Sequence, residues 1–198
     1  MPEARLRPLS YEMLDSAQRE MWDAIAAGPR AQTAVREEGH LTGPFDVLLR
    51  SPDIGLAVSE LGARLRYGSS LDQYDTELVI VTVAGHWRAR FAWLRHVDYA
   101  KRAGIDDAIV AEIGSGSTPN LTRERDRVIY SLVRGLLAHG RVSDQDYSRA
   151  RVILGERSLV DLVVLTGYYT LSSFVLNTFD VPLPAGTHSP WDEPTERN

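Results

Sequence analysis

The chain has 198 residues, of which 43% are hydrophobic and 25% charged, so it has ordinary globular composition and is long enough to bury a sizeable core in one domain. Its 22 Lys and Arg against 27 Asp and Glu give a net charge of −5 without a basic block, so nucleic acid is not an expected partner. The absence of cysteine excludes disulfides, thiolate metal sites, peroxidatic thiols and cysteine nucleophiles from this chain.

The sequence predicts a cytoplasmic protein that does not bind membranes. Its first residues, MPEARLRPLSYEMLD, contain no apolar core of a signal peptide. The longest apolar-rich run, from Leu159 to Leu176, is interrupted by Asp161, Gly167, two tyrosines and two serines. We therefore do not expect this run to span a bilayer.

Helix start and stop signals are frequent from the beginning of the chain. A first helix is expected from Ser10 to Gly28, because its apolar residues recur at helical spacing. The following stretch, from Pro29 to Pro44, is expected to be a loop. Ser51-Pro52 then predicts a helix up to about Gly68, since serine can cap free amides and proline at the first position loses no hydrogen bond.

The rest of the chain continues the helical pattern. Further helices are expected over about 71–87, 90–103, 106–113, 123–138, 143–154 and 158–179. The last of these begins with Ser158-x-x-Asp161, a variant of the capping box. No segment alternates with the period of two that strands require, so the sequence predicts an all-α domain of seven or eight helices.

Glu77 is a carboxylate at the start of the apolar run LVIVTVA. A charged group in apolar surroundings is costly unless it is paired or its pKa is raised, so Glu77 is a candidate functional residue. The structural alternative is that Asp75, Thr76 and Glu77 form the first turn of a helix, where the helix dipole favours acids. The residues alone favour this structural alternative.

His96 is accompanied by two small side chains. Ala92 precedes it by four positions and Ala89 by seven, so both lie on its side of a helix. Alanines at these positions leave room for a closely packed helix or for a ligand. A lone histidine in an amphipathic helix is usually structural, so the residues alone do not assign His96 a role.

A metal site would have to unite Glu77, His86 and His96. Their spacings of nine, ten and nineteen residues differ from the i, i+4 spacing of helical metal ligands, so no metal site is predicted. Nine residues also place Glu77 and His86 about 180° apart on a continuous helix. These two side chains converge only if the helix breaks, for which Gly85 is a suitable place.

The frame E-x(11)-A-x-x-A-x-x-x-H, filled by Glu77, Ala89, Ala92 and His96, resembles the core of the carboxymuconolactone decarboxylase and alkylhydroperoxidase D superfamily. Segments such as LTGPFDVLLRSPDIG and GYYTLSSFVLNTFDVPLP extend the likeness over nearly the whole chain. The resemblance implies one helical domain over residues 1–184, with a core at about 45–115 and a polar tail at 185–198. It also implies a homo-oligomer, a trimer or hexamer, with pockets close to subunit contacts.

In the peroxidase branch of this superfamily, cysteines occupy the positions of Ala89 and Ala92. The resemblance therefore implies an enzyme without thiol peroxidase activity, in which Glu77 and His96 transfer protons without a cofactor. His86, at the adjoining bend, is a further catalytic candidate. Candidates for lining the pocket are Phe45, Trp87, Ala89, Ala92, Tyr168, Tyr169, Phe174 and Asn177. The expected substrate is a small carboxylated or lactone compound that undergoes decarboxylation, isomerisation or lactone opening.

Two other functions remain open at this point. The first is a non-catalytic, oligomeric protein on the same scaffold that binds a small molecule. A metal-dependent lyase or hydratase would instead use Glu77, His86 and His96 as ligands. His86 also has a structural alternative, a hydrogen bond to backbone at a helix end, and aromatic side chains at helical spacing more often belong to a core than to a cavity.

Overall fold

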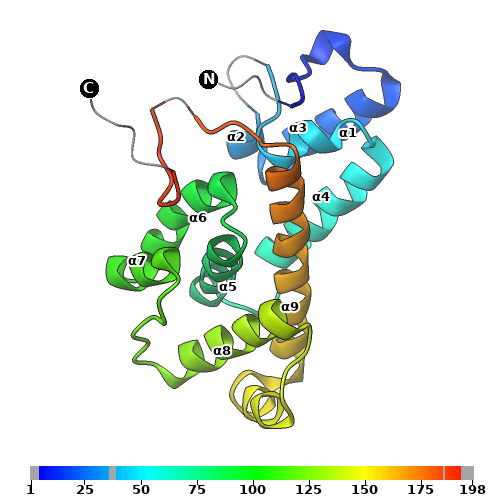
Figure 1. Ribbon diagram of the computed structural model, residues 1–198. Helices are drawn as coiled ribbons and strands as arrows, with labels where there is room; N and C mark the ends of the chain where they lie inside the picture. Colours follow the sequence, from blue (N-terminus) through cyan, green and yellow to red (C-terminus); the bar gives the residue numbers. More distant parts are fainter. Residues whose placement is uncertain (1–4, 36–38, 185, 193–198) are drawn as a thin grey trace, which may run out of the picture. The chain divides into compact units, whose positions relative to one another are not determined.

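The computed structural model describes residues 5–35, 39–184 and 186–192 (Figure 1). These residues form nine α-helices and one 3-10 helix and contain no strand, which confirms the predicted all-α fold. The chain groups into two compact units. The first comprises residues 1–69 and 175–182, and the second comprises residues 70–174 and 183–198.

The first unit contains short and long helices around a small apolar core. Its elements are η1 (Tyr11–Met13), α1 (Ser16–Ala26), α2 (Ala31–Ala34), α3 (Pro44–Leu48) and α4 (Pro52–Tyr67). Helix α1 packs against α4. The buried cluster consists of Leu14, Met21, Ile25, Ala34, Leu41 and Leu49.

Two expectations for this unit need correction. The first helix, α1, begins at Ser16 and not after Ser10, and it is capped by Asp15: the Asp15 side chain accepts from the Gln18 amide, and the Gln18 side chain accepts from the Asp15 amide. This reciprocal pairing satisfies two amides that a helix start leaves free. The stretch after Pro29 is not entirely a loop, because it contains the single-turn helix α2. The start of α4 at Pro52 is confirmed, although Ser51 makes no side-chain cap.

The second unit is arranged around α5 (Figure 1). It contains α5 (Gln73–His86), α6 (Arg90–Arg102), α7 (Asp107–Ser115), α8 (Glu124–His139) and most of α9 (Asp144–Thr178). Helix α5 contacts α6, α7 and α8, and all its residues from Asp75 to Ala84 are buried. It continues through Gly85, where a Cβ atom would lie 3.1 Å from Ile113 and 3.3 Å from Trp93. Gly85 therefore permits close packing and does not break the helix.

A tight turn connects α5 to α6 and reverses the chain. Arg88 takes a left-handed conformation with φ of 47°, and the amide of Ala89 donates to the carbonyl of Ala84 at 2.9 Å. This bond spans five residues, as in a common helix C-terminal motif. The reversal lays α6 against α5, so that residues nineteen positions apart can meet.

Helix α9 combines two helices that the sequence predicts separately. Gly155 interrupts it with φ of 78° and ψ of 163°. The second helix restarts immediately after Gly155, so the predicted capping box at Ser158 and Asp161 is wrong. The Asp161 carboxylate instead accepts from the amide and the hydroxyl of Ser70, at 2.8 and 2.7 Å.

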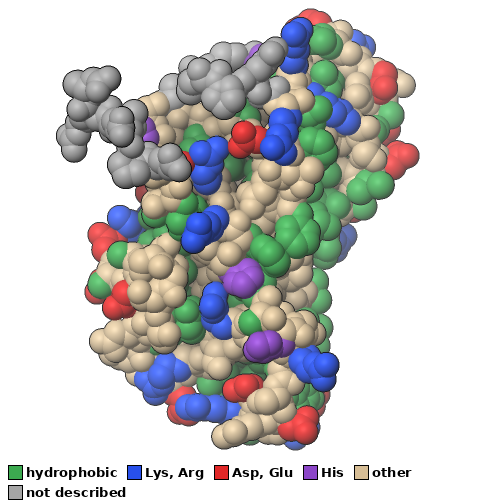
Figure 2. Space-filling view, in the orientation of Figure 1, with side chains coloured by type: hydrophobic (Ala, Val, Ile, Leu, Met, Phe, Trp, Pro, Cys, Tyr) green, Lys and Arg blue, Asp and Glu red, His purple; other side chains and the backbone are tan. Residues whose placement is uncertain are grey.

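The second half of α9 exposes apolar side chains. Val160, Val164, Leu171 and Phe174 are 60%, 40%, 41% and 50% exposed, and they recur at helical spacing. Hydrophobic side chains lie on the surface along the course of this helix (Figure 2). By length and composition alone α9 could cross a membrane, but half of its most apolar window is buried inside the protein, as is common for core helices. One such helix is weak evidence for a membrane protein.

Part of the predicted polar tail is fastened to the second unit. The Trp191 indole donates to the Gly114 carbonyl at 2.9 Å, and its ring packs edge-on against Trp93. Asp192 forms a 2.9 Å ion pair with Arg90. The other tail positions, 185 and 193–198, lie outside the described residues.

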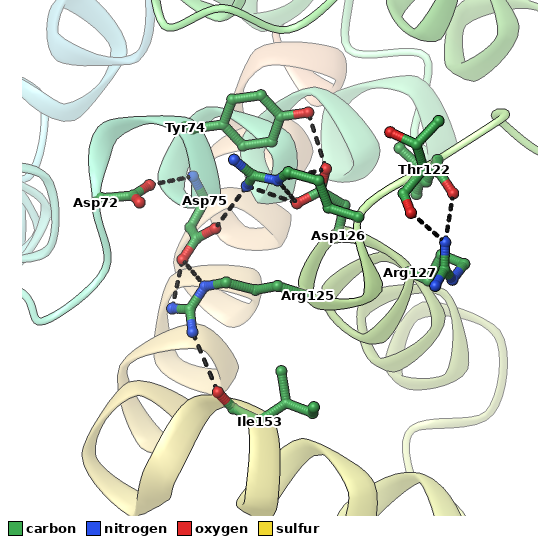
Figure 3. A network of polar contacts seen from close by, with 10 residues as sticks. Asp72, Tyr74, Asp75, Thr122, Arg125, Asp126, Arg127 and Ile153 are labelled. Carbon is green, nitrogen blue, oxygen red and sulfur yellow. Dashed lines mark hydrogen bonds and ion pairs between the residues drawn. The ribbon is translucent and has the colours of Figure 1, made fainter.

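A charged network ties α5 to α8 and α9 (Figure 3). Asp75 is fully buried, and one of its oxygens accepts from two nitrogens of Arg125, at 2.7 and 2.6 Å. Arg125 also donates to the carbonyl of Ile153. Burial raises the pKa of the Asp75 carboxyl, and Arg125 opposes that shift. The guanidinium therefore stabilises a charge that would be costly to bury alone.

Replacing Arg125 by Met should destabilise the protein by about 3 kcal/mol, because the buried Asp75 carboxylate loses both hydrogen bonds from Arg125 and keeps the longer 3.9 Å ion pair with Arg123. The measurement is urea unfolding followed by circular dichroism. Arg149→Met is the matched control, since Arg149 pairs with Glu124 at the surface and both side chains are about half exposed. That variant should lose less than about 1 kcal/mol. Equal losses in the two variants would contradict the importance of the buried pair.

Gly155→Ala should destabilise the protein by about 1–3 kcal/mol, because the backbone at Gly155 is in a region that essentially only glycine adopts. Gly167→Ala, in the same element, should be neutral or stabilising by up to about 1 kcal/mol. Gly167 is exposed, and a Cβ atom there would meet nothing within 4 Å. Thermal unfolding of both variants provides the comparison, and a neutral Gly155→Ala would show that the interruption is not required.

Candidate active site

Glu77 and His96 form a buried pair between α5 and α6. His96 Nδ1 and Glu77 Oε2 are 2.7 Å apart, and the two residues are only 6% and 1% exposed. The α5–α6 reversal brings the side chains together, as the family resemblance implies. The structural alternative, an acid in the first turn of a helix that interacts with the helix dipole, does not account for the position of Glu77. Its carboxylate is buried and hydrogen-bonded to an imidazole.

The hydrogen bonds assign the two ring nitrogens different roles. An ionised carboxylate only accepts, so the Nδ1–H of His96 donates to Glu77. The other nitrogen, Nε2, is then an acceptor in the neutral ring, and the Tyr169 hydroxyl lies 3.4 Å from it. Tyr169 is 5% exposed and packs edge-on against the imidazole. The result is a chain of carboxylate, imidazole and phenol, with a short first contact and a long second one.

The side of α6 that carries His96 is densely packed. Ala89 and Ala92 are buried, with exposures of 0% and 4%. The ring of Tyr99, which was not among the candidate site residues and was expected to point away from His96, lies 5.7 Å from the His96 ring. Tyr99 follows His96 by three residues, and this helical spacing is the sequence signal that could have placed the two rings side by side. Tyr99 also lines a pocket of about 630 Å³ between α6 and the residues Pro184 and Thr187–Pro190, so it contacts both that pocket and His96.

His86 belongs to a different group of side chains. Nine residues along α5 separate it from Glu77 by about 13 Å along the helix axis. Its Nδ1 lies 3.2 Å from Nη1 of Arg134 on α8. Burial, and then the charge of Arg134, lower the pKa of the His86 imidazole. The structure therefore pairs His86 with an arginine that no sequence signal indicated, and its bond is not to backbone.

Trp87 continues this second group toward α9. Its ring packs edge-on against His86 and Phe174, with centroid distances of 4.6 and 4.8 Å. Its indole nitrogen donates to the hydroxyl of Thr170 at 3.3 Å. Thr170 is adjacent in sequence to Tyr169. Neighbouring residues of α9 therefore contact Trp87 in one group of side chains and His96 in the other.

The remaining pocket candidates are distributed over both units. Tyr168 is 9% exposed and packs against Tyr169 at 5.3 Å between ring centroids. Phe45 lies in α3 of the first unit, under the guanidinium of Arg30. Asn177 lies in the last turn of α9, which also belongs to the first unit. Roles in substrate binding stay predictions for all three residues.

The geometry does not unite the three candidate metal ligands, because His86 is bonded to Arg134 while Glu77 and His96 are bonded to each other. Within residues 5–35, 39–184 and 186–192, no group of three or more His, Asp or Glu side chains could hold a metal ion.

Comparisons of sequence found no protein-family model and no curated protein that matches the chain. Comparisons of structure found several solved proteins of low sequence identity. An AhpD-core, peroxidase-related protein from Ralstonia eutropha has a TM-score of 0.72 at 14% identity and covers 93% of this chain and 94% of its own. A protein of unknown function from Agrobacterium tumefaciens, proposed to be the antioxidant defence protein AhpD, has a TM-score of 0.63 at 16% identity; the match covers 70% of this chain and 95% of that protein.

A third structure is a cysteine-to-alanine variant of the debrominase Bmp8 in complex with 2,3,4-tribromopyrrole. It has a TM-score of 0.67 at 12% identity and covers 92% of this chain and 95% of its own. Similarity at this level of identity concerns the fold alone. The chain therefore has the helical fold of the alkylhydroperoxidase D core, and the predicted resemblance is confirmed at the level of the fold.

Proposed function

We propose that the protein is an enzyme that processes a small carboxylated or lactone compound by proton transfer at His96, in a decarboxylation, isomerisation or lactone opening. The observation that carries this proposal is the 2.7 Å contact between His96 Nδ1 and Glu77. The carboxylate holds one tautomer of the imidazole and stabilises the imidazolium that forms when Nε2 takes up a proton. The same geometry orients the base in other enzymes that rely on a carboxylate and a histidine.

The long contact between Tyr169 and Nε2 supports this assignment. At 3.4 Å the phenol makes only a long hydrogen bond to Nε2, so a substrate atom that reaches this nitrogen replaces a weak contact. In an isomerisation, Nε2 removes a proton beside a carbonyl and returns it to another carbon. In a decarboxylation, the carboxylate leaves as carbon dioxide, and the protonated Nε2 donates its proton to the resulting carbanion.

The chain contains no cysteine, so the proposed reaction uses no thiol. Ala89 and Ala92 occupy the two positions where the peroxidase branch has cysteines, and both alanines are buried. The debrominase with the same fold holds a small brominated pyrrole, which supports the use of this scaffold for a small organic substrate. No cofactor is required for proton transfer between an imidazole and a substrate.

A non-catalytic protein that binds a small molecule is the second candidate. The side chains of Glu77 and His96 are only 1% and 6% exposed. Such a buried pair can serve to fix the packing of α5 against α6 without taking part in a reaction, and this favours the non-catalytic candidate. Both candidates predict a retained or bound small molecule. They differ in whether the molecule is converted.

The proposal predicts that the protein catalyses deuterium incorporation into, or carbon dioxide release from, at least one member of a panel of small keto acids and carboxylated lactones in D₂O. Proton NMR of the panel measures both events. His96→Gln and Glu77→Gln should each reduce the rate by a factor of about 10²–10⁴, the usual contribution of a positioned acid or base.

The matched control is His139→Gln, which alters an exposed histidine at the end of α8. This variant should keep the rate of the unaltered protein. Bound but unconverted panel members would support the binding protein. Conversion at full rate by His96→Gln would overturn the assignment of His96.

We also propose that the protein forms a homo-oligomer through the exposed apolar face of α9, made of Val160, Val164, Leu171 and Phe174. An aligned row of large apolar side chains is unusual on a surface that stays in water. Native mass spectrometry should show a multimer, and Val160→Glu should shift it toward the monomer. Val152→Glu is the control, since Val152 is 82% exposed but precedes the Gly155 interruption. A monomeric unaltered protein would contradict this proposal.

A further inference from the structure

A second pocket, of about 550 Å³, lies on α8 and the preceding loop, apart from the Glu77–His96 pair. Its lining combines two arginines with hydroxyl and amide side chains. The lining residues are Gly116, Thr118, Pro119, Asn120, Leu121, Arg127, Tyr130, Ser131 and Arg134. None of these residues is acidic. The volume is typical of sites for small molecules, which are about 300–1,000 Å³.

Arg134 carries a charge that its neighbour does not balance. A guanidinium has no acceptor atom, so Nη1 of Arg134 donates to Nδ1 of His86 across the 3.2 Å contact. In this contact Nδ1 of His86 carries no proton, and the acceptor is a neutral ring. The bond orients the guanidinium and leaves its positive charge uncompensated.

Arg127 is in the same situation. Its Nη1 donates to the carbonyls of Leu121 and Thr122, at 2.9 and 2.6 Å, and these acceptors carry no net charge. Within the part of the chain that the structure describes, neither Arg127 nor Arg134 forms an ion pair with a carboxylate. Seven residues separate them, so they lie on one face of α8 about 10 Å apart.

One acidic side chain does reach the rim of the pocket. The carboxylate of Glu112 accepts from the backbone amide of Asn120 at 2.8 Å. This bond holds the loop that forms one wall. It leaves the two guanidinium groups, together with the hydroxyls of Tyr130 and Ser131, as the donors available on α8.

We propose that this pocket binds the oxyanion group of a small molecule, a carboxylate or a phosphate, through Arg127 and Arg134. The planar fork of arginine matches the oxygens of both groups, and charge-assisted hydrogen bonds are about twice as strong as neutral ones. The site does not depend on the proposed reaction, because it shares no residue with the Glu77–His96 pair. It assigns His86 a positioning role, since its ring holds Arg134 at the pocket wall.

The test is isothermal titration calorimetry of the full chain with two probes, inorganic phosphate and succinate, at fixed pH and ionic strength. Saturable binding of at least one probe is expected, and the probe that binds identifies the phosphate or the carboxylate class. Arg134→Gln and Arg127→Gln should each raise the Kd about tenfold or more, the loss expected for one charge-assisted contact. Bound anion should also shift the ¹⁵N resonances of His86, because Arg134 contacts that ring.

The matched control is Arg157→Gln, which removes the same charge from an exposed arginine outside the pocket. Its Kd should equal that of the unaltered protein. Equal weakening in Arg157→Gln would overturn the site, because only net charge would then matter. Absence of saturable binding for both probes would overturn it as well. Arg127 is exposed, so its variant keeps the test valid should Arg134→Gln fail to fold.

Discussion

The burial of α5 from Asp75 to Ala84 is the constraint on which the second unit depends. Asp75 and Glu77 lie on a helix whose residues from 75 to 84 have lost contact with water. An unpaired buried carboxylate costs several kcal/mol, so both acids require donors from neighbouring helices. Arg125 on α8 provides the donor for Asp75, and His96 on α6 provides the donor for Glu77. The interactions that hold the helices together therefore also build the candidate active site.

The two ends of α5 serve two different chemistries. Near its start, Glu77 fixes the tautomer of His96, and the packing around this pair is dense. At the last residue of α5, His86 accepts a hydrogen bond from the guanidinium of Arg134 on α8. Arg134 lines the pocket of about 550 Å³, whose lining contains no acidic side chain. Because a helix is rigid and nine residues long between these points, the two histidines act in separate environments.

Fold and function are only loosely connected in this protein. Its fold is that of peroxidase-related proteins and of a debrominase, at sequence identities of 10–16%. The frame that carries redox cysteines in the peroxidase branch has alanines in this chain, while the carboxylate and the imidazole remain. The activity therefore depends on the side chains of the pair and not on the fold, since one scaffold accommodates many activities. What a buried carboxylate and imidazole can do best is to move protons.

The sequence by itself determined the fold class and most helix bounds, whereas a common site for Glu77 and His96 was expected only from the family resemblance. Helix caps, helix-ending glycines and hydrophobic periodicity involve residues within about four positions of one another, so the sequence shows these signals directly. Only the tertiary structure decided that Asp161 binds Ser70, 91 positions away, that Arg125 meets Asp75 across 50 positions, and that Arg134 meets His86 across 48. Such partners are chosen by the packing of whole helices and the burial of charge, and no local pattern records them.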